Sequence, residues 1–113
     1  MNILHVVNIY FVLPYFIGDQ FTYFKERGYR MNVVCSPSEY LADYAKQQGF
    51  DYIETPVNRS ISIKQDLASI RNICKFIRKK KIDIVVGHTP KGALLGMIAG
   101  WLCSVPKRIY FRH

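Results

Sequence analysis

Residues 82–92 read IDIVVGHTPKG, an apolar run that passes directly into a helix start. We expect a buried strand over residues 82–86 and a helix over residues 90–103. Thr89 is a suitable N-cap, and proline fits the first helical position. Lys91 would then lie in the first helical turn, where the helix dipole disfavours a cation. Its position indicates either a functional group or a solvated lysine that reaches into water.

The rest of the chain repeats this alternation of short apolar runs and helical patterns. A capping box, Ser-Pro-Ser-Glu at residues 36–39, predicts the start of a second helix that ends at Gly49. A similar box at residues 62–65 predicts the start of a third helix. Pro14 is the expected start of the first helix, which ends at Gly28 and has an apolar face of Phe16, Ile17, Phe21 and Phe24. The other expected strands span residues 3–7, 31–35, 52–55 and 108–111.

Alternating strands and helices with short connections predict an α/β fold, a Rossmann-like three-layer sandwich around a parallel five-stranded sheet. Right-handed crossovers favour the strand order 3-2-1-4-5. Ligands of such sheets bind at the carboxyl ends of the strands, where the strand order reverses. We therefore expect Asn8, residues 88–91 and His113 to meet at one rim of a single domain spanning residues 1–113.

The third helix should present two different faces. Basic side chains there suit either a solvated face or an anionic membrane surface. Its expected buried stripe is Ile63, Leu67, Ile70, Cys74 and Ile77. Its basic stripe is Lys64, Arg71, Lys75 and Arg78, with Lys79, Lys80 and Lys81 at the end.

The formal charge of +8 is unevenly distributed along the chain. Residues 59–113 carry twelve Lys and Arg against two Asp and Glu, whereas residues 1–58 are slightly acidic. This asymmetry indicates an anionic partner, which could be membrane lipid, a phosphorylated substrate or nucleic acid. The three cysteines have the odd count and wide spacing of reduced thiols in a cytosolic protein. The longest apolar run, residues 93–103, is too short to span a bilayer.

Several common catalytic motifs are absent from the sequence. Residues 8–13 contain no glycine, so the dinucleotide fingerprint is missing after the first strand, and no Walker A, D-x-D, G-x-S-x-G or H-E-x-x-H pattern occurs. We therefore expect neither a metal site nor a bound cofactor. The remaining polar groups suit proton transfer by imidazole and contact with phosphate oxygens. For His88 a structural cap is an equally good interpretation, and His5 is expected to be a core residue.

Three segments resemble a known family: MNILHVVN at residues 1–8, FKERGYRMNVVCSPS at residues 24–38, and HTPKGALLGMIAGWLCSVPKRIYFRH at residues 88–113. Together they resemble the N-terminal, acceptor-side domain of family-4-type glycosyltransferases of GT-B fold, in particular bacterial enzymes of capsular or O-antigen polysaccharide synthesis. Many of those relatives carry a Gly-Gly loop after the first strand, where this chain is aromatic and free of glycine.

The resemblance implies transfer of a sugar from a nucleotide-sugar donor to a lipid-linked or saccharide acceptor. By position, His113 would be the catalytic group, while His88, Lys91, Arg59 and Asn8 would contact the acceptor or a phosphate. It also implies a cytoplasmic protein at the inner face of the cell membrane, with the donor held mainly by a second domain. We expect the isolated 113 residues to transfer no sugar.

Two alternatives share this architecture. The chain could be a non-catalytic subunit that recruits a catalytic partner to the membrane, or the first part of a sugar-nucleotide epimerase. Nucleic acid is not an expected partner, because the basic residues accompany no known nucleic-acid-binding motif.

Overall fold

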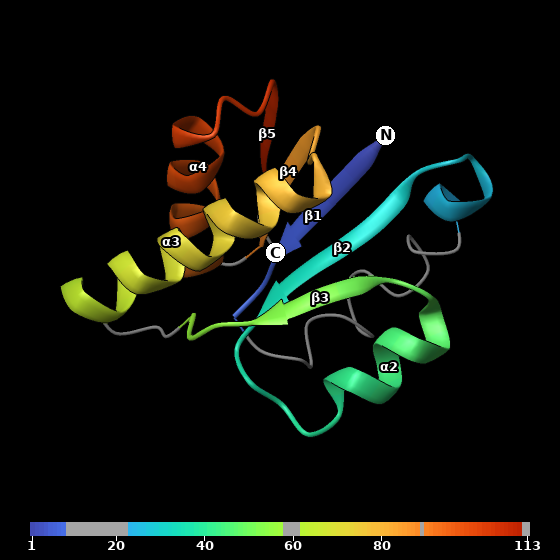
Figure 1. The fold of residues 1–113 in the computed structure, drawn as a ribbon, viewed down its shortest axis with the longest axis horizontal. Helices are drawn as coiled ribbons and strands as arrows, with labels where there is room; N and C mark the ends of the chain where they lie inside the picture. The colour runs from blue at the N-terminus through green and yellow to red at the C-terminus, as the bar shows by residue number, and fades with distance from the viewer. Residues whose placement is uncertain (9–22, 58–61, 89, 112–113) are drawn as a thin grey trace.

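A computed structural model describes residues 1–8, 23–57, 62–88 and 90–111 of this chain. Five parallel strands form one sheet in the order β3-β2-β1-β4-β5 (Figure 1), which confirms the predicted fold class and strand order. The strands are β1 (Asn2–Val6), β2 (Arg30–Cys35), β3 (Asp51–Glu54), β4 (Ile84–His88) and β5 (Lys107–Phe111). The helices are α2 (Leu41–Gln48), α3 (Ile63–Lys80) and α4 (Pro90–Leu102).

The helices cover the two faces of the sheet, as Figure 1 shows. Helices α3 and α4 pack against each other on one face, and α2 lies on the other. Side chains alternate between these faces along β1. Ile3 and Val7 join the core under α2, whereas Leu4 and Val6 join the core under α3 and α4.

The predicted first helix falls largely outside the described residues. Its final turn, residues 23–26, is helical, and Gly28 follows with a φ of +87°. The amide of Tyr29 bonds back to the Phe24 carbonyl at 3.0 Å. The expected glycine end of this helix is therefore confirmed.

The capping box predicted at residues 36–39 is wrong. Helix α2 begins at Leu41, and its N-cap residue, Tyr40, makes no side-chain capping bond. The hydroxyl of Ser36 instead accepts a hydrogen bond from the Val57 amide at 2.9 Å, so that side chain is engaged with a distant loop. Ser62 is the N-cap residue of α3, as expected, but its side chain makes no capping bond either.

The predicted buried stripe of α3 is wrong in its first half. Ile63 and Leu67 are 74% and 62% exposed. The buried position in this half is Ser69, whose hydroxyl donates to the Pro56 carbonyl at 2.6 Å. Polar partners on the neighbouring loop thus orient the start of the helix. The second half follows the usual apolar rule, with Ile73, Cys74, Phe76 and Ile77 buried.

Strand β4 begins two residues later than predicted and extends to His88. Lys81 ends α3 in the left-handed conformation, and the Ile82 amide bonds back to Ile77. The Asp83 amide then bonds to the Asn2 carbonyl at 2.8 Å before the strand starts. As a result His88 belongs to the strand rather than to the turn.

Candidate functional site

The carboxyl ends of β1 and β4 are adjacent, and this is where the strand order reverses. Val6 pairs in register with Gly87, so Asn8 and His88 leave neighbouring strands at the same edge. Lys91 follows in the first turn of α4. We refer to Asn8, His88 and Lys91 as the rim. Sequence reasoning expected these residues to meet, and their placement at one edge of the sheet agrees with that expectation.

Helix α4 packs directly against strand β4. A Cβ atom added at Gly87 would lie 2.4 Å from the Ala93 Cα, so only glycine fits here without a backbone shift. Gly96 lies against Val6 and Val85, where an added Cβ atom would meet valine methyl groups at 3.2–3.3 Å. The small residues of α4 therefore serve close packing on the sheet, which fixes where the rim side chains begin.

His88 is fully buried and contacts His5 on the neighbouring strand. The His5 Nδ1 and His88 Nε2 atoms lie 2.9 Å apart, so one ring donates a hydrogen bond to the other. Burial, and then the neighbouring His88 ring, lowers the pKa of His5 to about 3. His5 is therefore neutral near pH 7, and it is a buried core residue as expected. His88 lies at the end of strand β4.

Lys91 is buried in an ion pair. Its Nζ atom lies 2.7 Å from the Asp66 Oδ2 atom of α3, and the two side chains are 8% and 17% exposed. The interpretation of Lys91 as a solvated side chain is thus wrong. The carboxylate neutralises the charge that the α4 dipole opposes, and the pair ties α3 to α4 beside the rim.

Asn8 adds a polar atom to this edge of the sheet. Its side chain is buried, and among the described residues its Oδ1 atom has no hydrogen-bond partner. A buried amide oxygen accepts readily from a hydroxyl or an N–H group. The rim therefore combines the acceptor oxygen of Asn8, the imidazole of His88 in contact with His5, and the ammonium of Lys91 paired with Asp66.

Two predicted site residues, Arg59 and His113, lie outside the described residues. Phe111 pairs in register with His88, so β5 ends at the same edge of the sheet as β4. The roles assigned to Asn8, Arg59, His88, Lys91 and His113 stay predictions.

Sequence reasoning missed Asp66 and the contact between His5 and His88. Asp66 is one of only two acidic residues in the basic half of the chain, which was an available signal. His5 and His88 lie on strands predicted to be neighbours, so their pairing could have been proposed from the strand order. Among the described residues, no group of three or more His, Cys, Asp and Glu could hold a metal ion. None of the described helices is long and apolar enough to cross a membrane.

The family model described as "Glycosyl transferase 4-like" matches residues 3–113, a span that includes both strands of the rim and the whole β4–α4 turn. The chain belongs to this family. Two curated relatives agree with that membership. A UDP-Gal:alpha-D-GlcNAc-diphosphoundecaprenol alpha-1,3-galactosyltransferase of Escherichia coli is 30% identical over 84% of this chain. The capsular polysaccharide biosynthesis glycosyltransferase CapM of Staphylococcus aureus is 29% identical over 96% of it.

This glycosyl transferase 4-like chain spans about a quarter of the length of those relatives, 24% and 28% respectively. Its fold is also similar to that of a solved glycosyltransferase from Rickettsia africae. The TM-score is 0.71 and the sequence identity 20%, with 96% of this chain and 28% of that chain covered. This glycosyl transferase 4-like chain therefore shares the fold of the matching part of that structure.

Proposed function

We propose that this chain is the acceptor-side part of a glycosyltransferase that moves a sugar from a nucleotide-sugar to a lipid-linked saccharide during cell-surface polysaccharide synthesis. The observation that carries the proposal is the family match across residues 3–113, which includes the rim. Both curated relatives named above are glycosyltransferases, and this favours transfer over epimerisation. The lipid-linked acceptor is proposed by analogy with the Escherichia coli relative.

In the proposed reaction, an acceptor hydroxyl attacks the sugar carbon that bears the nucleotide diphosphate. The new glycosidic bond forms as the bond to the diphosphate breaks, and the hydroxyl proton leaves to a base. His113 is the proposed group near the reacting centre, since imidazole accepts protons near neutral pH. Asn8, Arg59, His88 and Lys91 are proposed contacts of the acceptor or its phosphates.

The test uses the full-length gene product, a panel of nucleotide-sugars and a short-chain lipid-diphosphate saccharide as acceptor. Product mass and nucleotide release are measured together, so transfer is separated from hydrolysis and from epimerisation. We expect H113A to lower kcat by roughly a hundredfold or more. The control K107A changes an exposed lysine at the opposite end of the sheet and should leave kinetics unchanged. Absence of transfer from every donor would refute the proposed activity.

We also propose that the exposed face of α3 lies on an anionic membrane. This face combines the exposed apolar side chains of Ile63 and Leu67 with Lys64, Arg71 and Lys75. Asp66, the only acidic residue of α3, is occupied by Lys91. Apolar and basic side chains on one helix face are typical of helices that lie at a bilayer surface.

Co-sedimentation with phosphatidylglycerol vesicles tests this second proposal. Binding of the full-length protein should weaken as salt is added, because the lysine and arginine contributions are screened. I63S/L67S should weaken binding further at high salt, where the apolar contribution remains. Binding that is insensitive to both changes would contradict the proposed orientation.

A further inference from the structure

A pocket lies between the edge strand β3 and the second half of α3, at the end of the sheet opposite the rim. Its volume is about 350 Å³. Strand β3 has no neighbour on its outer side among the described residues, so the pocket opens along that edge. Its lining residues are Phe50, Asp51, Tyr52, Ile53, Asn72, Lys75, Phe76, Lys79 and Lys80.

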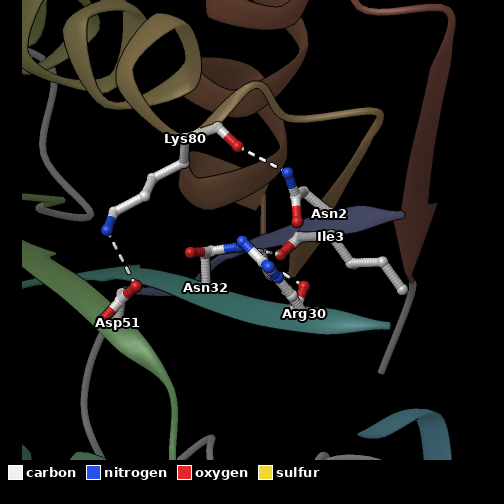
Figure 2. Close-up of polar contacts among 6 residues, drawn as sticks. All are labelled: Asn2, Ile3, Arg30, Asn32, Asp51 and Lys80. Carbon is white, nitrogen blue, oxygen red and sulfur yellow. Dashed lines mark hydrogen bonds and ion pairs between the residues drawn. The ribbon is translucent and has the colours of Figure 1, made fainter. Parts of the chain in front are cut away.

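One wall of the pocket is held in place by a network at the end of α3. Figure 2 shows the Asn2 side chain donating to the Lys80 carbonyl, at 2.6 Å, while the Lys80 side chain extends to Asp51. The Lys80 Nζ atom lies 2.8 Å from the Asp51 Oδ2 atom. The end of the helix is thereby fixed to β1 and β3, so the lysines project from a positioned backbone.

The charge in this pocket is not balanced. Of its three lysines, only Lys80 pairs with a carboxylate; no carboxylate among the described residues lies within ion-pair distance of Lys75 or Lys79. The α3 dipole contributes about half a negative charge near Lys79 and Lys80. Three lysines, one aspartate and this partial charge leave an excess of about 1.5 positive charges in the pocket.

The remaining lining residues suit an organic ligand that carries the anion. Phe50 and Phe76 are buried, belong to the cores on the two faces of the sheet, and each line the pocket, as does half-buried Tyr52. Asn72 adds an exposed amide that can donate or accept a hydrogen bond. Lysines and aromatic rings in the lining of one pocket suit a phosphate group whose sugar or glycerol part packs on a ring.

We propose that this β3–α3 pocket binds a phosphate group carried by a sugar or by a phospholipid headgroup, with Lys75 and Lys79 as its direct contacts. The proposal does not depend on the transferase reaction. The pocket is at the amino end of the strands, and strands of five residues separate it from the rim by roughly 15 Å.

Lysine acetylation of the full-length protein, followed by mass spectrometry of each lysine, tests the proposal. One arm adds glucose 1-phosphate, and the other adds short-chain phosphatidylglycerol as monomers, so that no bilayer is present for the exposed face of α3 to bind. At a ligand concentration about ten times Kd, acetylation of Lys75 and Lys79 should slow about tenfold. Lys64 is the internal control, because it is exposed on the same helix and does not line the pocket.

Protection of Lys75 and Lys79 by glucose 1-phosphate assigns a soluble sugar phosphate, and protection by the monomeric short-chain lipid alone assigns a lipid headgroup. Protection of Lys64 to the same extent in both arms, or no protection in either, would overturn the proposal.

Two charge-matched variants give a second measurement. K75A/K79A should raise the Kd obtained from protection of Lys80 about tenfold or more, since two charge-assisted contacts are lost. K64A/R71A removes the same charge from α3 outside the pocket and should leave that Kd within about twofold. Equal weakening in the two variants would show general charge attraction instead of a pocket and would refute the assignment.

Discussion

The coupling free energy of the ion pair between Lys91 and Asp66 should be far larger than that of a solvent-exposed ion pair. At the observed 2.7 Å, with an effective dielectric constant of about 20, the attraction is about 6 kcal/mol. Desolvation of both groups opposes this attraction. We therefore expect a net coupling free energy of about 3 kcal/mol, because both side chains are largely withdrawn from water.

A double-mutant cycle of D66N, K91M and D66N/K91M measures this coupling. Hydrogen exchange of the α4 amides in the full-length protein reports the local opening free energy. D66N alone leaves a buried ammonium without its counter-ion, so exchange in α4 should accelerate about 150-fold. The double variant should recover much of that loss, because no unpaired charge remains.

The exposed pair Lys80–Asp51 is the matched control. Its Nζ–Oδ2 distance of 2.8 Å is nearly the same, but its side chains are 30% and 65% exposed. A cycle of D51N and K80M should give a coupling below about 1 kcal/mol. The reasoning fails if the coupling of Asp66 with Lys91 is no larger than this control value.

Three further outcomes follow from buried groups and close packing. Burial, and then the Glu54 carboxylate, raises the pKa of Cys35 to about 12. Iodoacetamide should therefore leave Cys35 unmodified in the native protein, whereas it should alkylate the partly exposed Cys103. Equal alkylation of the two cysteines, measured by mass spectrometry, would contradict this. The lowered pKa of His5 means that only the unfolded state binds this proton between about pH 6.5 and 3. Stability should therefore fall by about 1.4 kcal/mol per unit as pH decreases through that window. Urea midpoints of H5F should show a shallower slope, and an unchanged slope would count against the assignment. Gly87→Ala should lower the free energy of unfolding several times more than Gly96→Ala does. The Cβ added at position 87 would lie 2.4 Å from backbone, whereas the Cβ added at position 96 would meet valine methyl groups at 3.2–3.3 Å. Similar denaturation midpoints for the two variants would argue against this.

The strand order could be predicted from the sequence because two physical constraints act together. Apolar runs separated by helical patterns restrict the chain to parallel pairing, and right-handed crossovers then restrict the order. The sequence also predicted a strand followed directly by a helix around the Gly-His-Thr-Pro-Lys segment, although β4 begins two residues later than expected. These features depend on local pattern and chirality, which a single sequence carries.

The wrong predictions, of the capping box at residues 36–39 and of the first half of the buried stripe of α3, concern side chains whose bonding partners are distant in sequence. Ser36 has the pattern of a capping residue, but its hydroxyl bonds to the amide of Val57. Ile63 and Leu67 follow helical spacing, yet Ser69 and Asp66 take the inward positions because Pro56 and Lys91 satisfy them. Periodicity alone cannot identify such partners, since it treats every polar residue as outward-facing.

The central position of β1 has a consequence for biosynthesis. This strand is synthesised before the other four strands of the sheet, but Ile3 pairs with Ile84 of β4, and Asn2 also bonds to Asp83. At about 5–20 residues per second, translation reaches Ile84 roughly 4–16 s after Ile3. Throughout that interval the nascent chain contains an apolar strand whose β4-side edge is unpaired, and such an edge can pair with other chains. The time needed to translate the chain as far as β4 is therefore the time for which this edge of β1 lacks its native neighbour.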